Sequence, residues 1–277
     1  MSLVSIPEKN WVTVPVDISF PGQDSPSTDL VAEEQPLELR FHGKPASVLM
    51  RTPGHDRELA LGFLFHEEII TSVDQVQSID RPDKEGCLGE PADNILEIQL
   101  DTPSRMKGLD RFFFSTSSCG ACGKKSLESV TVHGPMVQGD FMVTYSLLGT
   151  LTDRLLPHQV LFHQTGGVHA CGLFTPQGDL VCLREDVGRH NAFDKLAGFA
   201  LIHRLHPLSA NILLLSGRVG YEMAQKAIVS GIPMIVAVGA PTSLAVELCE
   251  KWGITLVGFL RGKKMNIYTH PKRVRTG

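Results

Sequence analysis

Three short apolar segments alternate with two helical segments in the second half of the chain, and this alternation constrains the fold most. The apolar segments are NILLLSG (211–217), PMIVAVG (233–239) and ITLVGFL (254–260). The segments between them, 221–231 and 243–253, carry apolar residues at helical spacing. Strands that are apolar at nearly every position are typical of a parallel sheet covered by helices. The second half therefore predicts an α/β fold with right-handed crossovers.

Further elements extend the predicted sheet. VHACGLFT (168–175) and LVCLRED (180–186) flank the turn sequence PQGD and predict a β-hairpin. NAFDKLAGFALIHRL (191–205) predicts an amphipathic helix, and MNIYTH (265–270) predicts a fourth strand after the three apolar ones. A hairpin beside parallel strands makes the sheet mixed and only partly parallel.

The first half is less regular. Its first 36 residues, rich in Pro, Ser and acidic residues, predict one or two strands within loops. Segments 37–43 and 46–52 flank Lys44-Pro45 and predict a hairpin. Segment 57–70 predicts a helix with Asp56 as its N-cap, and 94–100 predicts a strand.

These two patterns predict two domains. Residues 1–140 are expected to form a smaller α+β domain, and residues 141–277 the α/β domain. The second domain includes 146–164, where leucines at helical spacing predict a helix that Pro157 breaks or kinks. The polar segment 101–125 predicts a long loop in the first domain.

The composition excludes several classes of protein. The 277 residues include 26 Lys and Arg and 30 Asp and Glu, and this net charge of −4 argues against general nucleic-acid binding. No apolar run approaches the roughly 18–20 residues of a membrane span, and the N-terminus lacks the features of a signal peptide. Six cysteines in a chain of this length make no disulfide scaffold. We therefore expect a cytoplasmic protein with reduced thiols and no membrane partner.

Two cysteines separated by two residues, Cys119 and Cys122, stand in the predicted loop, within 115–125. Such a pair is half of a tetrahedral zinc site, but the sequence has no second CxxC to complete one. A thioredoxin-type redox pair needs a preceding strand, which this Gly- and Ser-rich segment does not predict. Two further interpretations are structural cysteines and a nucleophilic, sulfur-handling thiol. For the thiol, Lys124 and Lys125 favour the thiolate form.

Small and polar residues follow each of the three apolar strands. They are Ser216–Arg218 after the first strand, Gly239–Ser243 after the second and Phe259–Lys264 after the third. In an open parallel sheet, ligands bind beyond the carboxyl ends of the strands. Backbone N–H groups at the helix starts there favour anions. The sequence thus predicts a surface that accepts phosphate at this end of the sheet.

Two histidines and a group of charged residues stand in or directly after the predicted hairpin. Asp186, Arg189 and His190 follow the predicted hairpin, and they either line a polar ligand pocket or belong to a solvated helix start. His169 follows two glycines and either faces a ligand or is a satisfied histidine in a turn.

Three charged residues follow the first apolar strand. Arg218 comes directly after it and either contacts a ligand or is a surface arginine. Glu222 and Lys226 stand four residues apart in the predicted helix 221–231, a spacing that predicts an ion pair on the helix surface.

Together these motifs resemble the FdhD family, the formate dehydrogenase accessory sulfurtransferases. The similar segments begin near residue 30 and include RELALGFLFHEEII, CGACGKKSLE, TGGVHA, REDVGRHNAFDKLAG, SGRVGYEMAQKA, APTSLAVELCEKWGITLVGFLRG and NIYTHPKRV. Each segment alone is a weak signal, whereas the combination in this order is specific.

The resemblance implies a cytidine deaminase-like three-layer core and a sulfurtransferase activity. Members accept persulfide sulfur from a cysteine desulfurase on the CxxC loop. They pass it to the molybdenum cofactor, Mo-bis(molybdopterin guanine dinucleotide), before this cofactor enters formate dehydrogenase. The cofactor is then a bound substrate, and no permanently bound metal is expected. A zinc deaminase is not expected, because its His-x-Glu motif has a glutamate two residues after the histidine, whereas His169 is followed by Ala and Cys.

The resemblance also implies roles for residues. Cys119 is expected to carry the persulfide, with Cys122 as its partner. The matching cofactor-binding segment consists of Phe259, Leu260, Arg261, Gly262, Lys263 and Lys264. Arg218, His169, Asp186 and His190 are also expected to bind the cofactor.

Two hypotheses remain besides a sulfurtransferase. One is a chaperone that binds and delivers the molybdenum cofactor without sulfur chemistry, for which the cysteines would not matter. The second is a protein with a structural zinc ion. A two-fold homodimer is the default expectation for the oligomeric state.

Overall fold

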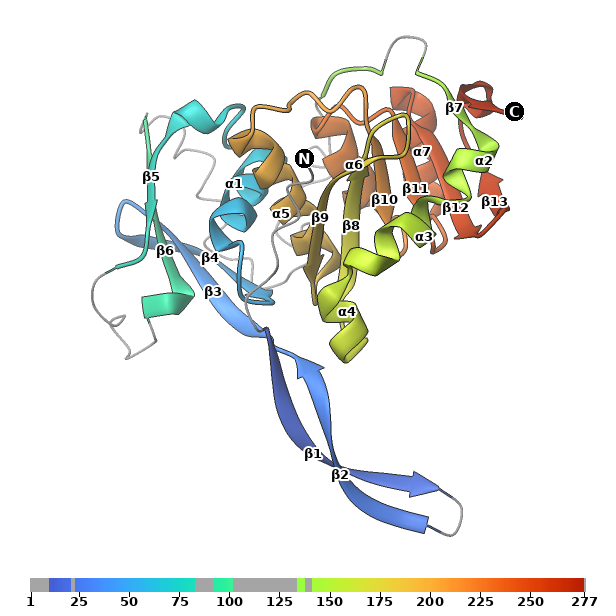
Figure 1. The fold of residues 1–277 in the computed structure, drawn as a ribbon. Helices are drawn as coiled ribbons and strands as arrows, with labels where there is room; N and C mark the ends of the chain where they lie inside the picture. The colour runs from blue at the N-terminus through green and yellow to red at the C-terminus, as the bar shows by residue number, and fades with distance from the viewer. Residues whose placement is uncertain (1–9, 21–22, 83–91, 102–133, 138–140, 277) are drawn as a thin grey trace.

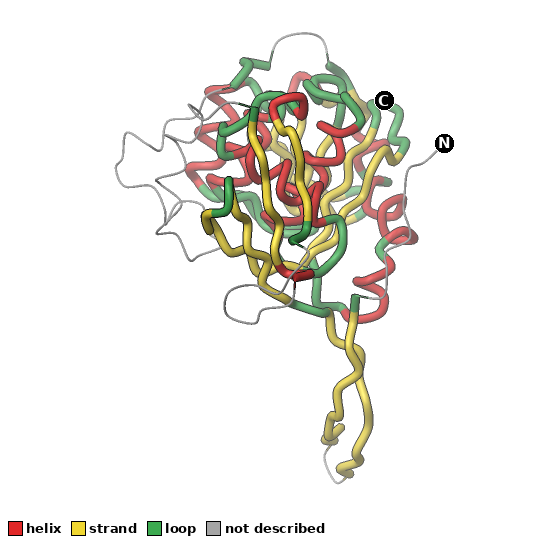
Figure 2. The backbone as a smooth tube through the Cα atoms, turned by 90° about the vertical axis from the view of Figure 1, so that its left-hand side faces the viewer, coloured by secondary structure: helices red, strands yellow, loops and turns green. Residues whose placement is uncertain are grey.

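The computed structural model describes residues 10–20, 23–82, 92–101, 134–137 and 141–276. Figure 1 shows a body with a sheet on each side and helices between them, from which an arm projects. The arm pairs β1 (Trp11–Phe20) with β2 (Gln23–Ala32), which confirms the strands expected near the N-terminus. Figure 2 shows from a second side that the arm extends away from the body.

The six-stranded sheet has the order β13-β12-β11-β10-β8-β9. Its strands are β8 (His169–Phe174), β9 (Leu180–Asp186), β10 (Ile212–Leu215), β11 (Met234–Ala237), β12 (Thr255–Arg261) and β13 (Lys264–Ile267). The three central strands β10, β11 and β12 are parallel, whereas β8, β9 and β13 join antiparallel. The predicted mixed α/β sheet is therefore confirmed.

Helices cover both faces of this sheet. Leu213 and Leu215 pack into one core with α5 (Arg189–Ile202), α6 (Tyr221–Val229) and α7 (Ser243–Trp252). Ile212 and Leu214 point the opposite way, into a core shared with α2 (Tyr145–Leu148) and α3 (Leu151–Leu155). Because side chains alternate along a strand, strands apolar at every position feed both cores.

The four-stranded sheet has the order β4-β3-β6-β5. Its strands are β3 (Gln35–Phe41), β4 (Lys44–Arg51), β5 (Val76–Asp80) and β6 (Ile95–Leu100), and α1 (Asp56–His66) packs on it. The predicted hairpin is confirmed, but its turn is His42-Gly43, with φ of 48° and 77°, rather than Lys44-Pro45. Two successive positive φ values suit a tight hairpin turn.

Helix α1 starts differently from the prediction. His55 occupies the N-cap position, and Asp56 is the first helical residue. The Asp56 carboxylate is buried and accepts two hydrogen bonds from Arg51, at 2.9 and 3.0 Å. The expectation that Asp56 caps the helix was wrong, because a buried arginine binds its side chain instead.

Helix α5 lies between the two sheets (Figure 1). Residues 191–201 are all buried, so the helix is not amphipathic as predicted. Its side chains are either apolar or polar with partners inside the protein. One side of α5 packs on the six-stranded sheet, and the other packs along α1. Helices enclosed in this way lack a solvated face.

Several short elements complete the fold. The predicted helix 146–164 is divided into α2, α3, a 3₁₀ turn (Leu156–His158) that contains Pro157, and α4 (Val160–Thr165). The others are β7 (Val143–Thr144), β14 (Val274–Arg275) and the 3₁₀ turns Val73–Gln75, Ala92–Asn94 and Pro271–Arg273. Within the described residues, none of the helices has the length and apolar character that a bilayer span requires.

Candidate functional site

The loops that follow β10 and β11 are joined by backbone hydrogen bonds. Gly239 N donates to Gly217 O at 3.2 Å, and Val219 N donates to Ala240 O at 3.1 Å. On the other side, Phe259 N donates to Gly239 O at 3.2 Å. We call the residues that end these strands, with His169 at the start of β8, the strand-end surface: His169, Ser216–Arg218, Gly239–Ser243 and Gly258–Phe259.

Glycines allow this close approach. A Cβ on Gly239 would lie 2.7 Å from Gly217 O, which is too short for any side chain. A Cβ on Gly217 would lie 3.3 Å from Nδ1 of His169. The ring of His169 therefore stands directly beside the end of β10.

The starts of α5 and α6 meet at this surface. His190 Nε2 lies 2.8 Å from Glu222 Oε2, and both side chains are largely buried. Burial lowers the pKa of His169, and the charges of Arg189 and His190 lower it further, against an opposing effect of Asp186. The neutral form of His169 is thus favoured, in which one ring nitrogen donates and the other accepts.

Asp186 lies beneath this surface. It is fully buried, and its Oδ2 lies 2.7 Å from Lys195 Nζ. Its Oδ1 accepts hydrogen bonds from Gly188 N at 2.8 Å and Asn191 Nδ2 at 3.1 Å, and its Oδ2 accepts one from Thr52 N at 3.2 Å. With this set of internal partners, Asp186 fixes the start of α5 rather than facing a ligand.

The segment Phe259–Lys264 is not a loop that follows β12. The strand continues to Arg261, and a tight turn connects it to β13, with a register shift between Gly258 and Arg261. Leu260 is 1% exposed and belongs to the core between the sheet and α2–α3, so its side chain points away from solvent. Phe259, at φ 54° and 40% exposed, faces solvent.

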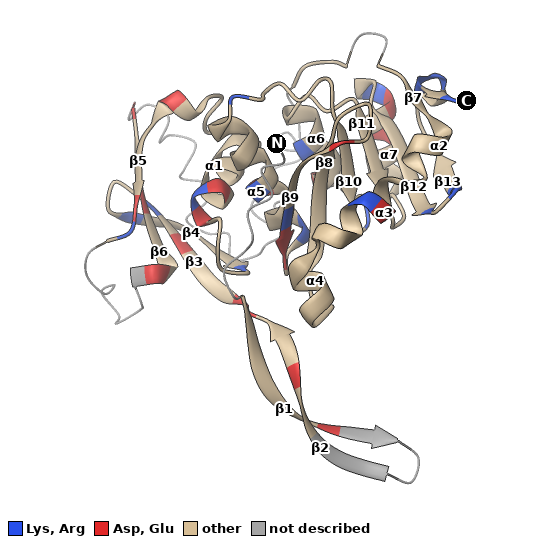
Figure 3. Ribbon diagram, viewed as in Figure 1, with Lys and Arg blue, Asp and Glu red and all other residues tan. Residues whose placement is uncertain are grey.

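The β12–β13 turn presents basic residues (Figure 3). Arg261, Lys263 and Lys264 are exposed, and the Tyr145 hydroxyl donates to Lys263 O at 2.6 Å, which anchors the turn. Arg218 is exposed after β10. Since β10 and β12 are parallel, Arg218 after β10 and the three cations at the β12–β13 turn lie toward the same edge of the sheet. Such an arrangement suits a ligand with several negative charges.

Glu222 was misassigned from the sequence. It pairs with His190, whereas Lys226 reaches the buried carboxylate of Asp194, at 2.5 and 2.7 Å. The predicted Glu222–Lys226 pair was therefore wrong. One feature of the sequence could have indicated the His190–Glu222 pair. His190 and Glu222 each stand two residues after a glycine at a helix N-cap.

Asp194 also belongs to a buried polar group with His66 and Ser230. His66 Nδ1 lies 2.6 Å from Asp194 Oδ1, and His66 Nε2 lies 2.9 Å from Ser230 Oγ. Such a Ser–His–Asp order resembles a hydrolase triad. All three side chains are buried within the helix layer, so this group ties α1 to α5 and α6 instead.

The predicted sulfur-handling pair, Cys119 and Cys122, lies outside the described residues, as does the whole segment 115–125. Cys171, Cys182 and Cys249 are described, and they are free and buried. Burial raises the pKa of the Cys182 and Cys249 thiols to about 12. Within the described ranges, no group of three His, Cys, Asp or Glu is arranged to hold a metal ion.

Comparison with known proteins gives a consistent result. A sequence model of the FdhD/NarQ family matches residues 32–275. The chain is 46% identical over 263 residues to the sulfur carrier protein FdhD of Streptomyces coelicolor, which covers 91% of this chain and 92% of the relative. It is 43% identical over 249 residues to the sulfur carrier protein FdhD of Sulfurisphaera tokodaii, with 89% and 92% covered.

The fold also matches a solved structure. A crystal structure of a proposed formate dehydrogenase accessory protein from Desulfotalea psychrophila has a TM-score of 0.74. The match covers 96% of this chain and 99% of that chain at 24% sequence identity, so the likeness concerns the fold.

Proposed function

The chain belongs to the FdhD/NarQ family, and on that premise we propose that it is a sulfur carrier with sulfurtransferase activity. It takes persulfide sulfur from a cysteine desulfurase on Cys119 and delivers the sulfur to the molybdenum cofactor, Mo-bis(molybdopterin guanine dinucleotide), for formate dehydrogenase. The observation that carries this proposal is the extended similarity to relatives named sulfur carrier protein, together with the CxxC sequence.

The first step is a thiol exchange. The Cys119 thiolate attacks the outer sulfur of the donor's persulfide, the S–S bond of the donor breaks, and the donor cysteine leaves as a thiolate. Cys119 then holds the persulfide, and no net oxidation has occurred. The two lysines that follow, Lys124 and Lys125, favour the anionic form of this group.

The second step releases the sulfur. The Cys122 thiolate attacks the inner sulfur of the persulfide and forms a Cys119–Cys122 disulfide, and the outer sulfur leaves as hydrosulfide. Hydrosulfide, with one proton from the medium, exchanges for an oxygen ligand of the molybdenum, which leaves as water. A dithiol reductant then restores both cysteines for the next cycle.

The strand-end surface and the β12–β13 turn are the proposed binding place for the molybdenum cofactor, as a substrate. Its guanine dinucleotides carry several phosphates, which suit Arg218, Arg261, Lys263 and Lys264. Gly217 and Gly239 let the loops after β10 and β11 pack against each other, which brings their backbones together at this surface. The imidazole rings of His169 and His190 add hydrogen-bonding groups beside this surface.

Further parts of the proposal concern the whole protein. We propose a cytidine deaminase-like topology for the six-stranded sheet and its helices, a domain boundary at 140/141, a two-fold homodimer, and a cytoplasmic location. The sheet order and the mixed strand directions are compatible with the first of these.

Mass spectrometry of tryptic peptides tests the proposal. The protein is incubated with a cysteine desulfurase and cysteine, and we expect a gain of one sulfur atom on the peptide that holds Cys119. Cys119→Ala should abolish this gain, whereas Cys249→Ala, which changes a buried cysteine on α7, should retain it. A gain of sulfur on the Cys119→Ala peptide equal to that of the wild type would contradict the assignment of Cys119 as the sulfur carrier.

The same variants distinguish a chaperone without sulfur chemistry. If the Cys119→Ala, Cys122→Ala double variant still activates formate dehydrogenase in cells, delivery of the cofactor does not need the cysteines. The exposed cations at the strand ends favour this second function, since they need no cysteine to bind a ligand.

A further inference from the structure

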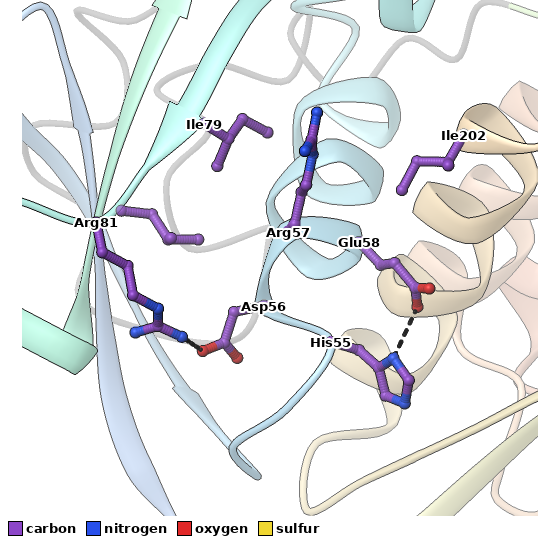
Figure 4. Close-up of a pocket in the computed structure, with 8 residues that line it drawn as sticks. His55, Asp56, Arg57, Glu58, Ile79, Arg81 and Ile202 are labelled. Carbon is purple, nitrogen blue, oxygen red and sulfur yellow. Dashed lines mark hydrogen bonds and ion pairs between the residues drawn. The ribbon is translucent and has the colours of Figure 1, made fainter. Parts of the chain in front are cut away.

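A second region of the molecule has the shape of a binding site. A pocket with a volume of about 430 Å³ lies where α1 begins, between α5 and the four-stranded sheet. Figure 4 shows its lining residues, which are His55, Asp56, Arg57, Glu58, Ile79, Arg81, Leu96 and Ile202. Ligand pockets commonly occupy about 300–1,000 Å³. The strand-end surface lies at the start of α5, about 20 Å from the end of α5 that lines this pocket.

Part of the wall is aliphatic. Ile79 and Leu96 belong to the core of the four-stranded sheet and present buried side chains to the pocket. Ile202, the last residue of α5, is 38% exposed beside them. These three side chains form an apolar surface that a hydrocarbon group of a ligand can contact in place of water.

The two carboxylates of the pocket already have cationic partners. Asp56 binds Arg51 through both oxygens and accepts a further hydrogen bond from Arg81, at 2.8 Å. Glu58 accepts two hydrogen bonds from Arg184, at 2.5 and 2.8 Å. These carboxylates are therefore committed to the protein.

Positive charge exceeds negative charge here. Burial acts to raise the pKa of Glu58, but hydrogen bonds from Arg184 and His55 lower it to about 2. Within the part of the chain that the structure describes, the exposed Arg57 guanidinium has no ion-pair partner. Arg81 is 41% exposed, and its only other acidic neighbour among the described residues, Asp93, is 3.9 Å away and almost wholly solvated. The guanidinium groups of Arg51, Arg81 and Arg184 thus bind the two largely buried carboxylates, and Arg57 adds a further cation to the pocket lining.

We propose that this pocket binds a carboxylate joined to an aliphatic group. Arg57 and Arg81 bind the carboxylate, and Ile79, Leu96 and Ile202 contact the aliphatic part. Guanidinium groups form paired hydrogen bonds with carboxylates, and the aliphatic wall favours a ligand with a hydrocarbon next to its charge. The source is a free carboxylic acid or an acidic peptide segment with aliphatic neighbours. The proposal is independent of sulfur transfer.

Calorimetric titration of the full chain tests it with defined probes. They are hexanoate, acetyl-Leu-Glu-Leu-amide, its Gln counterpart, and inorganic phosphate. We expect hexanoate or the Glu peptide to bind, and phosphate and the Gln peptide to bind more weakly. Binding by hexanoate alone identifies a free acid as the source, and binding by the Glu peptide alone identifies a peptide.

Matched variants connect the signal to the pocket. Arg57→Gln removes an exposed side chain and should weaken binding about tenfold, because a charge-assisted pair is lost. Ile202→Ser should weaken binding of the carboxylate probes and leave phosphate unchanged. Lys251→Gln, which removes another exposed charge, on α7, should have no effect. The proposal is overturned if neither carboxylate probe binds at millimolar concentration, or if Arg57→Gln binds them as tightly as the wild type.

Discussion

Gly62 of α1 and Gly198 of α5 each lie against the backbone of the opposite helix. A Cβ on Gly62 would stand 1.8 Å from Asp194 O, and a Cβ on Gly198 would stand 1.8 Å from Glu58 O. The two helices therefore touch through main-chain atoms at two positions one helical turn apart. This contact places α1, and the four-stranded sheet on it, directly on α5.

Gly198→Ala should destabilise the protein by about 3 kcal/mol or more, because the added methyl must push two backbones apart. Urea unfolding followed by circular dichroism measures the change. Gly167→Ala is the matched control, since its Cβ would meet only ordinary contacts, the nearest at 3.6 Å. Similar midpoints for both variants would contradict the close packing of α1 and α5.

Lys195→Met should cost about 3–5 kcal/mol, because it leaves the buried Asp186 carboxylate without its cation. Arg204→Gln removes the Arg204–Asp74 pair, whose side chains are 73% and 61% exposed, and should change the stability far less, because solvent screens an exposed pair. The comparison uses urea midpoints at neutral pH. A Lys195→Met variant as stable as Arg204→Gln would show that the Asp186–Lys195 pair does not hold the start of α5.

Stability should fall as the pH drops from about 6.5 toward 4. Burial lowers the pKa of His66 from 6.5 to about 4 in the folded state. The unfolded chain therefore takes up a proton on this histidine at a pH where the folded chain does not. The stability present above pH 6.5 is lost progressively through this window, by an amount on the order of 3 kcal/mol.

The measurement is the urea midpoint at pH 7.5 and pH 5.0 for the wild type and His66→Gln. The variant cannot titrate at this position, so its midpoint should change less between the two pH values. His206 and His169, whose pKa values are also lowered by burial, contribute equally to both proteins. Parallel losses in both proteins would refute the role of His66.

Cys171, Cys182 and Cys249 should resist alkylation in the native protein. Burial raises the pKa of each thiol, to about 12 for Cys182 and Cys249, so the reactive thiolate is scarce at pH 8. Mass spectrometry after iodoacetamide treatment should find these three unmodified until urea is added. Rapid native labelling of Cys249 would show that the α7 side of the sheet opens readily.

The order of strands and helices in the second half was predictable, because strands buried on both faces leave unbroken apolar runs. The surroundings of α5 were not. Asp194 and Lys195 belong to a helix that the sequence predicts as amphipathic, and their partners Asp186 and Lys226 lie elsewhere in the sequence. Only the packing of α1 on α5 shows that both charges are internal.

The candidate site was partly predictable for a related reason. Parallel strands end at one edge, so Arg218 was expected beside the loop that follows β11, and the structure places it there. The position of His169 beside the end of β10 was not predictable, because it depends on how β8 pairs with β10. The inward direction of Leu260 was not predictable, because it depends on where β12 ends and on the register shift beside it. The partner of Glu222 likewise depends on how α5 and α6 meet.

The position of α5 has a consequence for how the protein unfolds. One side of this helix completes the core of the six-stranded sheet, and the other side completes the core beneath the four-stranded sheet, through Leu201. Neither sheet can lose α5 without exposing apolar surface in the other. The two sheets therefore behave as one cooperative unit, and heat should melt them in a single transition although the chain forms them from separate stretches of sequence.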